Sequence, residues 1–511
     1  MQDMVGKSYS MGIFGMDAFR VEVEADLSQG IPSFDLVGLP DAAVKESRNR
    51  VRSAMTNCGF EFPVNRITMN LAPADVRKEG PIYDLPLLVA LLRATGQLVA
   101  DTDDSAFLGE LSLTGEVRPV RGCLPMTIEA KKQGFVSIYV PVENANEASV
   151  VKGIDVYPVK NVPELVKHLS GRAELNLVTY TESSDISDEI LPDFSDVKGQ
   201  EDAKRALEIA ASGNHNVLLI GPPGSGKSML AKRIPTILPD MTFEESIETT
   251  GIHSVAGTLN RPLIRHRPFR SPHHTISANG LSGGGVVPRP GEISLAHNGV
   301  LFLDELPEFS RSSMEILRQP LEDAEVTISR VSGTVTYPCK ILLLAAMNPC
   351  PCGFFGHPTR KCTCSPMSVS RYLSKISGPL LDRIDLHIEV PSVEYESLSS
   401  SEKSESSAQI KKRVNAARQI QLERYKGTGV TCNADAPSAL LHETCRMSPE
   451  ADRLMKQAFE KFGFSARTYD RVVKVARTIA DLAASDDIRQ EHMAEAVQYR
   501  TLDRKYWTRE L

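Results

Sequence analysis

The sequence lacks any apolar run that approaches the ~20 residues required for a membrane-spanning helix. Its N-terminus also lacks the charged segment followed by an apolar segment that marks a signal peptide. Both absences predict a cytoplasmic protein with no membrane partner. An excess of positive charge is missing too, because the formal net charge is −7 over 511 residues. Any contact with nucleic acid must therefore come from local basic patches.

Cysteine is scarce, with nine residues in the chain, and in the cytosol these are expected to be free thiols or metal ligands rather than disulfides. Four of them form two Cys-x-Cys pairs within residues 350–364. They are Cys350, Cys352, Cys362 and Cys364. Four thiolates close tetrahedrally on Zn²⁺, so the pattern favours a structural zinc site. Reduced thiols without a metal and an iron–sulfur cluster are the alternatives, and His357 is a weaker candidate ligand.

The sequence does contain a glycine-rich loop typical of phosphate binding. The loop consists of Gly221, Pro222, Pro223, Gly224, Ser225, Gly226, Lys227 and Ser228. An apolar run precedes it and a helix-forming run follows, which is the context such a loop needs. Its N–H groups are expected to face phosphate oxygens, with Lys227 on the outer phosphates and the Ser228 hydroxyl on Mg²⁺. The loop predicts binding of a nucleoside triphosphate, with the base near Val197 and Gln200.

Two further apolar runs end in polar residues suited to hydrolysis. Residues 300–305 end in Asp304, which suits the surroundings of Mg²⁺, and Glu305, which suits deprotonation of the attacking water. Residues 341–348 end in Asn348, whose amide is expected to hold the same water. The alternative for Asn348 is a turn residue before Pro349.

Two arginines complete the predicted site. Arg383 is expected at a helix end, from which it would reach the γ-phosphate of a neighbouring subunit. An ion pair with Asp382 or Asp385 is the alternative. Arg467 opens a C-terminal helix and is expected to reach the nucleotide from there, with Arg471, one turn further on, as the alternative candidate.

The pattern of the chain predicts several domains. Helical patterns at 46–57, 84–98 and 127–134 alternate with strand-like runs at 19–23 and 66–70, which predicts a mixed α/β domain at the front. Alternating signals after the glycine-rich loop predict an α/β domain with a parallel sheet. The expected segments are a front domain (1–171), an acidic linker (172–196), an ATPase core (197–395), a polar linker (396–407) and a helical lid (408–511). Within the core we expect an insertion (about 261–292), a hairpin (about 325–337) and a four-cysteine knuckle (350–364).

The front domain contains two segments, 77–86 and 113–126, that resemble the proteolytic domain of Lon-type proteases. That family uses a serine activated by a lysine, because a serine hydroxyl alone is a weak nucleophile. Ile82 stands where the serine is expected and Met126 where the lysine is expected. The resemblance therefore implies a Lon-protease-like α+β fold, of the ribosomal S5 domain 2 type, without the catalytic dyad.

The nucleotide motifs, in this order, resemble the AAA+ ATPases. Segments 267–277, 291–305 and 349–353 resemble the magnesium-chelatase-like branch, and with the front domain the whole arrangement is similar to the ComM/YifB family. The resemblance implies ATP as the nucleotide, a homo-hexameric ring and DNA branch migration in natural transformation. It implies AAA+ roles for Lys227, Ser228, Asp304, Glu305, Asn348, Arg383 and Arg467.

Two segments are candidates for DNA contact. Alternating polar and apolar residues around 330–333 predict a β-hairpin, and in helicases of this branch the matching hairpin projects into the central pore. Arg330 and Ser332 near its tip are then expected to contact phosphates, and a solvated hairpin without a ligand is the alternative. Four arginines within 261–270 fit DNA contact and packing at a subunit interface equally well.

The leading functional hypothesis is an ATP-dependent DNA translocase that acts on single-stranded or branched DNA, with recombination proteins as possible partners. The first alternative is the ATPase motor of a complex that inserts Mg²⁺ into a porphyrin, although a chelatase motor is expected to lack a Lon-like module. The second alternative is an ATP-dependent protease, and Ile82 and Met126 count against it.

Overall fold

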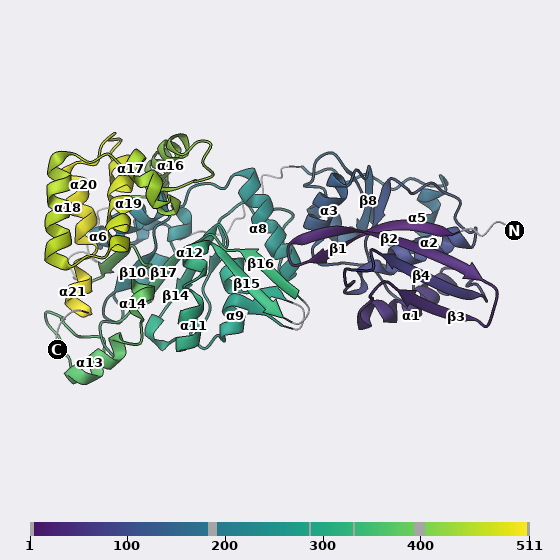
Figure 1. Ribbon diagram of the computed structural model, residues 1–511, viewed down its shortest axis with the longest axis horizontal. Helices are drawn as coiled ribbons and strands as arrows, with labels where there is room; N and C mark the ends of the chain where they lie inside the picture. Colours follow the sequence, from purple (N-terminus) through teal and green to yellow (C-terminus); the bar gives the residue numbers. More distant parts are fainter. Residues whose placement is uncertain (1–4, 182–191, 286–287, 331–332, 393–403, 508–511) are drawn as a thin grey trace. The chain divides into compact units, whose positions relative to one another are not determined.

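The computed structural model describes residues 5–181, 192–285, 288–330, 333–392 and 404–507 (Figure 1). Outside these ranges lie Ser332 and parts of both predicted linkers. The chain divides into two units, each made of two stretches of sequence. Unit 1 comprises Met1–Ile186 and Ser246–Ile264, and unit 2 comprises Ser187–Glu245 and Arg265–Leu511. Within the described ranges, no helix is both long and apolar enough to cross a membrane.

Unit 1 is built on a seven-stranded mixed sheet with the strand order β3-β4-β2-β1-β5-β8-β9. Strands β1 (Gly6–Phe14) and β2 (Asp17–Ser28) form a long antiparallel hairpin. The remaining strands are β3 (Ser33–Val37), β4 (Arg66–Ala72), β5 (Ser105–Phe107), β8 (Ser137–Pro141) and β9 (Asp155–Val159), with a separate ribbon of β6 (Glu110–Leu111) and β7 (Val117–Arg118). The pairs β1–β5, β5–β8 and β8–β9 are parallel.

Helices α1, α2 and α3 of unit 1 overlap the predicted segments but differ at their ends, and α4 and α5 were not predicted. They are α1 (Ala42–Asn57), the 3-10 turn η1 (Pro81–Tyr83), α2 (Asp84–Ala94), α3 (Cys123–Lys132), α4 (Val142–Ala148) and α5 (Val162–Leu169). Helix α1 begins four residues before the predicted start, because the Asp41 carboxylate accepts a hydrogen bond from Val44 N at 2.7 Å. Helix α2 ends before the predicted Leu98, because Gly96 has a left-handed φ of 71°.

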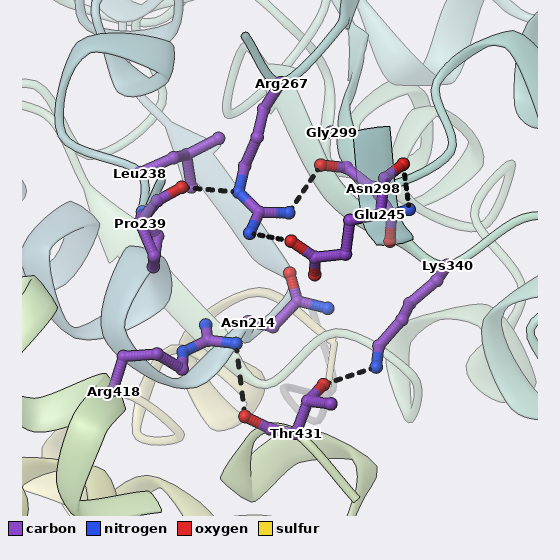
Figure 2. Close-up of a pocket in the computed structure, with 10 residues that line it drawn as sticks. All are labelled: Asn214, Leu238, Pro239, Glu245, Arg267, Asn298, Gly299, Lys340, Arg418 and Thr431. Carbon is purple, nitrogen blue, oxygen red and sulfur yellow. Dashed lines mark hydrogen bonds and ion pairs between the residues drawn. The ribbon is translucent and has the colours of Figure 1, made fainter. Parts of the chain in front are cut away.

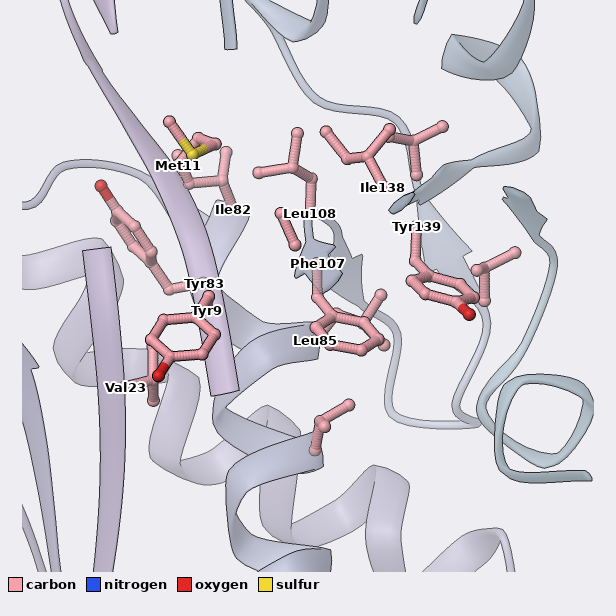
Figure 3. Packing of buried hydrophobic residues seen from close by; sticks show 14 of the residues in the cluster. Tyr9, Met11, Val23, Ile82, Tyr83, Leu85, Phe107, Leu108, Ile138 and Tyr139 are labelled. Carbon is pink, nitrogen blue, oxygen red and sulfur yellow. The ribbon is translucent and has the colours of Figure 1, made fainter. Parts of the chain in front are cut away.

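The core of unit 1 forms between the sheet and α2, which is apolar on all sides and buried from Leu85 to Leu92. Figure 3 shows Ile82 among the core residues, close to Met11 and Tyr83. Met126 is fully buried in the same cluster. The two positions where a Lon-type protease needs serine and lysine are thus part of the hydrophobic core.

Unit 2 contains a five-stranded parallel sheet with the order β11-β14-β17-β10-β18 (Figure 1). Its strands are β10 (Val217–Ile220), β11 (Phe269–Arg270), β14 (Gly299–Leu303), β17 (Ile341–Met347) and β18 (Leu386–Glu389). Every residue of β10, β14 and β17 is buried, as expected for parallel strands covered on both faces. The predicted α/β core with a parallel sheet is confirmed.

The remaining elements of unit 2 are mostly short around the sheet and longer in the C-terminal part. Before the C-terminal part the helices are α6 (Glu201–Gly213), α7 (Lys227–Ala231), α8 (Phe243–Ala256), most of whose residues belong to unit 1, α9 (Ala278–Ser282), α10 (Glu292–Leu295), α11 (Arg311–Ile316), α12 (Pro320–Asp323), α13 (Pro366–Leu373) and α14 (Gly378–Leu381). Two hairpins are β12 (Gly283–Gly284) with β13 (Arg289–Pro290) and β15 (Glu325–Arg330) with β16 (Gly333–Pro338). The 3-10 turns are η2 (Phe194–Asp196), η3 (Ile234–Thr236), η4 (Leu306–Glu308) and η5 (Asn433–Asp435). Helix α8 begins in the residues of unit 2 and ends in those of unit 1.

The C-terminal part of unit 2 is helical, as predicted, and packs on the five-stranded parallel sheet through α6. Its helices are α16 (Ser407–Arg424), α17 (Ser438–Thr444), α18 (Pro449–Phe462), α19 (Ala466–Leu482), α20 (Gln490–Gln498) and α21 (Leu502–Tyr506). Both α16 and α19 contact α6. Phe194, at the end of the predicted acidic linker, is fully buried in this core, and its N–H donates to Ser407 Oγ at 2.9 Å. The ends of the two predicted linkers therefore meet.

Candidate nucleotide-binding site and cysteine cluster

The predicted phosphate-binding loop connects β10 to α7 at the carboxyl end of an interior strand. Gly224 and Gly226 have φ values of 75° and 91°, which favour glycine. A Cβ atom at Gly221 would lie 2.2 Å from the carbonyl oxygen of Val390. A side chain at any of these three positions would therefore strain or displace the loop.

Lys227 is buried at the start of α7, where its amine donates to three oxygens. The acceptors are the carbonyls of Gly221 and Pro222, at 2.7 and 2.9 Å, and Asn348 Oδ1 at 3.2 Å. Burial lowers the pKa of Lys227, and the charges of Asp304 and Glu305 oppose that shift. The structure thus brings Lys227 and Asn348 into contact although 121 residues separate them.

Ser228 and Asp304 also converge. The Ser228 hydroxyl donates to Asp304 Oδ2 at 2.6 Å, and Asp304 Oδ1 accepts from the backbone N–H of Glu305 at 2.9 Å. A hydroxyl and a carboxylate side by side are oxygen donors of the kind that Mg²⁺ prefers. Both β10 and β14 are parallel to β17, so the carboxyl ends of all three strands meet at one edge.

Glu305 has a neighbour that the sequence did not predict. Its backbone is in the left-handed region, with φ of 55°, and its Oε2 lies 3.3 Å from Nδ1 of His274. His274 follows β11, which is paired with β14, so the sheet itself places the imidazole beside the carboxylate. In the sequence, the only signal for the contact between His274 and Glu305 was the presence of two adjacent histidines at 273–274.

The predicted base-binding residues are split between the loop and the core. Gln200 has a left-handed φ of 63°, and its Nε2 donates to Pro391 O at 2.6 Å and Ser225 O at 3.4 Å. Val197 is fully buried, and its carbonyl accepts from Ser404 Oγ at 2.8 Å. Gln200 therefore borders the phosphate-binding loop, whereas Val197 is a core residue.

Arg383 and Arg467 both approach Glu322, on α12, which sequence reasoning missed. The Arg383 guanidinium is ion-paired with Glu322 and donates to Pro379 O at 2.7 Å. Arg467 Nη2 lies 3.7 Å from Glu322 Oε1. Burial lowers the pKa of Arg383, as do the charges of nearby arginines, including Arg467.

The alternative partner proposed for Arg383, Asp385, is taken by Arg471 instead, at 2.5 Å. Burial alone would raise the pKa of Asp385, but Arg471 and His215 hold it below its ordinary value. Arg471 therefore anchors α19 to the segment before β18. Of the two lid arginines, only Arg467 is largely exposed.

The four cysteines form a compact cluster whose sulfur atoms all lie within 4.8 Å of one another. Cys350 Sγ is 3.4 Å from Cys352 Sγ and 3.7 Å from Cys362 Sγ, and the latter two are 3.5 Å apart. Tetrahedral Zn²⁺ with Zn–S bonds of about 2.3 Å requires sulfur separations of about 3.8 Å, so these side chains fit zinc. His357 is not among the clustered residues. Its Nδ1 accepts a hydrogen bond from Arg360 N at 3.0 Å.

The cluster contains thiols in contrasting environments. Burial raises the pKa of Cys350 to about 12. At Cys352 burial acts in the same direction, but the N–H groups of Thr363 and Phe354 outweigh it and lower the pKa to about 5.

The predicted hairpin is present, with Arg330 opposite Gly333 at its tip. One face, formed by Val326, Ile328, Val335 and Tyr337, is buried, and the other is polar and exposed. Arg330 is exposed, and its Nη1 donates to Ser329 O at 2.9 Å. Ser332 lies outside the described residues.

Two residues of the arginine-rich segment form ion pairs with carboxylates of unit 2. Arg267 is paired with Glu245 at 2.9 Å, and Arg270 is held by both oxygens of Glu292 at 2.6 and 2.7 Å. Arg267 lines a small pocket in unit 2 that Arg418 and Lys340 also border (Figure 2). Both arginines therefore form ion pairs within the chain.

Comparison with known proteins agrees with this architecture. Family models described as magnesium chelatase subunit ChlI, subunit ChlI of Mg-chelatase, and the ChlI C-terminal part match residues 193–398, 23–144 and 404–500. The chain is 44% identical over 502 residues to competence protein ComM of Haemophilus influenzae and 44% over 499 residues to YifB of Escherichia coli, covering 97% of each chain. A shorter stretch of 153 residues, 28% of each chain, is 30% identical to Lon protease 2 of Bacillus subtilis.

Fold and site together define a P-loop AAA+ protein of the magnesium-chelatase type, with a Lon-like front part and a helical C-terminal part. Membership of this class indicates an ATPase that uses ATP and Mg²⁺. Within the class, the chain belongs to the ComM/YifB family.

Proposed function

We propose that this protein is an ATP-driven DNA motor that promotes branch migration during homologous recombination of transforming DNA. One observation carries the proposal. The exposed hairpin β15–β16 continues directly from α12, and Glu322 on α12 is ion-paired with Arg383. A force on the hairpin would therefore act on the helix that holds Arg383, an arginine suited to nucleotide hydrolysis. The name of the Haemophilus relative, a competence protein, favours the same role.

In hydrolysis, each of the residues at the carboxyl edge of the sheet would have a separate role. Lys227 exchanges its loop carbonyls for the outer phosphates, and Ser228 and Asp304 hold Mg²⁺, which supplies charge neutralisation when bound. Glu305 accepts a proton from the attacking water as the bond between the γ-phosphorus and the β–γ bridging oxygen breaks. Asn348 orients that water from the opposite side.

Subunits would act together as a homo-hexameric ring. Arg383, and with it Arg467, would leave Glu322 and reach the γ-phosphate bound by the adjacent subunit. The ion pair of Arg383 with Glu322 supports this role. Because the Glu322 side chain is 49% exposed, Arg383 could exchange this carboxylate for a phosphate. Hydrolysis would then depend on ring assembly.

DNA would pass the exposed hairpin tips, where Arg330, and Ser332 in the predicted contact, meet phosphates. The net charge of −7 requires such a local contact. We further propose that Cys350, Cys352, Cys362 and Cys364 hold a structural Zn²⁺, which their sulfur spacing fits.

The second candidate function is the ATPase motor of a magnesium-insertion complex. It is favoured by the names of the matching family models, one of which covers residues 23–144 inside unit 1. The front unit therefore does not exclude this candidate, contrary to our expectation from sequence. Close similarity over 97% of ComM favours the DNA motor.

The two candidates are separated by measuring ATPase rate with and without single-stranded or forked DNA. We expect stimulation by DNA, loss of that stimulation in Arg330→Ala, and a decrease of about 1 in the salt slope of DNA binding. Arg453→Ala is the matched control, because Arg453 is equally exposed but lies on α18. Indifference to DNA together with stimulation by a chelatase partner would establish the magnesium-insertion motor instead.

A further inference from the structure

The cysteine cluster packs directly against the phosphate-binding loop. A Cβ atom built on Gly353 would lie 2.3 Å from Cδ and 2.7 Å from Cγ of Pro223. The backbone of Gly353 is therefore in van der Waals contact with the ring of Pro223, and only glycine allows so close an approach. Gly353 directly follows one cluster cysteine, and its N–H donates to Cys350 O at 2.9 Å.

A second connection runs through the chain itself. Cys350 comes two residues after Asn348, whose Oδ1 accepts a hydrogen bond from Lys227 Nζ at 3.2 Å. The cluster thus adjoins the nucleotide site at two places. One is Pro223 in the phosphate-binding loop, and the other is Asn348, which contacts Lys227.

The segment that carries the cysteines has no regular secondary structure. Residues 350–364 are all described, and none of them belongs to a helix or a strand. In segments of this kind the free energy of metal binding also stabilises the folded conformation. Removing the metal would leave four sulfur atoms within 4.8 Å of one another and no cation to hold them together.

We propose that zinc bound by the cysteine cluster braces the phosphate-binding loop, so that nucleotide affinity depends on zinc occupancy. With zinc bound, the turn at 350–353 holds Pro223 and Asn348 in the arrangement that receives phosphates. Without zinc the turn relaxes, and Pro223 loses its support. The inference rests on the zinc site proposed above but is independent of DNA.

The first experiment compares the full-length protein as purified, stripped of zinc and reloaded with zinc. Zinc content is measured by mass spectrometry, and affinity by titration with a fluorescent ATP analogue under reducing conditions with Mg²⁺ present throughout. We expect about 10-fold weaker binding after stripping, equivalent to about 1.4 kcal/mol, and recovery on adding Zn²⁺. Unchanged affinity after stripping overturns the brace while leaving the zinc site intact. Failure to bind Zn²⁺ at all overturns both, and leaves the DNA motor untouched.

A pair of glycine variants tests the contact without removing the metal. Gly353 and Gly356 have similar left-handed φ values, 82° and 74°, so alanine strains the backbone at both. The nearest atom to a Cβ at Gly356 is Lys505 Cε at 3.9 Å, which leaves room for it. Only in Gly353→Ala would the added methyl group collide with the ring of Pro223.

We expect Gly353→Ala to bind the ATP analogue about 10-fold more weakly than Gly356→Ala, with full zinc content in both. Equal affinities for the ATP analogue in the two variants would show that the contact between Gly353 and Pro223 does not affect nucleotide binding. That result would contradict the proposal that zinc braces the loop. This comparison stays informative even if a variant such as Cys364→Ser fails to fold.

Discussion

At the scale of single residues, the pair of His274 and Glu305 shows how the site is completed by a contact that no motif contains. The imidazole Nδ1 lies 3.3 Å from the Glu305 carboxylate. If Glu305 is the base in hydrolysis, as proposed above, His274 would act through Glu305, which it contacts. It is a positioning residue rather than a catalytic one.

We expect His274→Ala to lower kcat for ATP hydrolysis by about 10- to 100-fold, because a misplaced Glu305 no longer meets the attacking water. ATP affinity and thermal stability should stay unchanged. If His274 had only a structural role, its removal would change these two quantities as well. His273→Ala is the matched control, since the centroid of the His273 ring lies 4.1 Å from that of His274, but the His273 side chain hydrogen-bonds to Thr275. Equal losses in the two variants would assign the effect to packing.

Sequence reasoning was sufficient where a function depends on consecutive residues. The loop 221–228 and the strand ends at Asp304 and Asn348 could be predicted because each follows an apolar run. Glu322 and His274 could not be predicted in this way. Their partners, Arg383 and Glu305, come from other elements, and only the packing of α12 and the pairing of β11 with β14 bring them together.

At the scale of elements, helix existence was easier to predict than helix ends. Apolar periodicity located α1, α2 and α3, but their limits depend on single capping residues such as Asp41 and Gly96. Isolated polar contacts between elements were harder still. Arg471 joins α19 to the segment before β18 through Asp385, which the sequence analysis considered, with Asp382, only as an alternative partner of Arg383.

This junction predicts a pH dependence of stability. The pKa of Asp385 is held below its ordinary value of 3.8 in the folded state, so the carboxylate is ionised there. As pH falls, the unfolded chain binds a proton at this residue first, which favours unfolding. The contribution of Asp385 is therefore fully present above about pH 4 and is lost as pH falls further.

Urea unfolding of the wild type and Asp385→Asn checks this expectation. At pH 7 the variant should be less stable by about 3–5 kcal/mol, since Arg471 is left with a neutral partner in a buried setting. The difference should shrink below pH 4. Asp382→Asn, at a partly exposed position three residues earlier, should change stability by no more than about 0.5 kcal/mol. A difference that is independent of pH would contradict the role of the charge.

At the scale of the whole molecule, the positions of the arginines bear on the proposed ring. Arg383 and Arg467 both approach Glu322, whereas Lys227, Ser228 and Glu305 gather at the carboxyl edge of the sheet. If Arg383 serves the neighbouring subunit, two inactive variants can restore activity to each other when they share a ring.

The test mixes Glu305→Gln with Arg383→Ala after each has been purified separately. Each alone should lose most ATPase activity, by about 10³-fold for the arginine. In mixed rings the Glu305→Gln subunit keeps its Arg383 and can supply it to the intact catalytic glutamate of its neighbour, so the mixture should regain activity. A mixture of Glu305→Gln with Lys227→Ala is the control, because both changes disable the site that their own subunit contributes. Recovery in neither mixture, with subunit exchange verified by labelling, would show that Arg383 acts within its own subunit, and the pair with Glu322 would then have to be a structural contact.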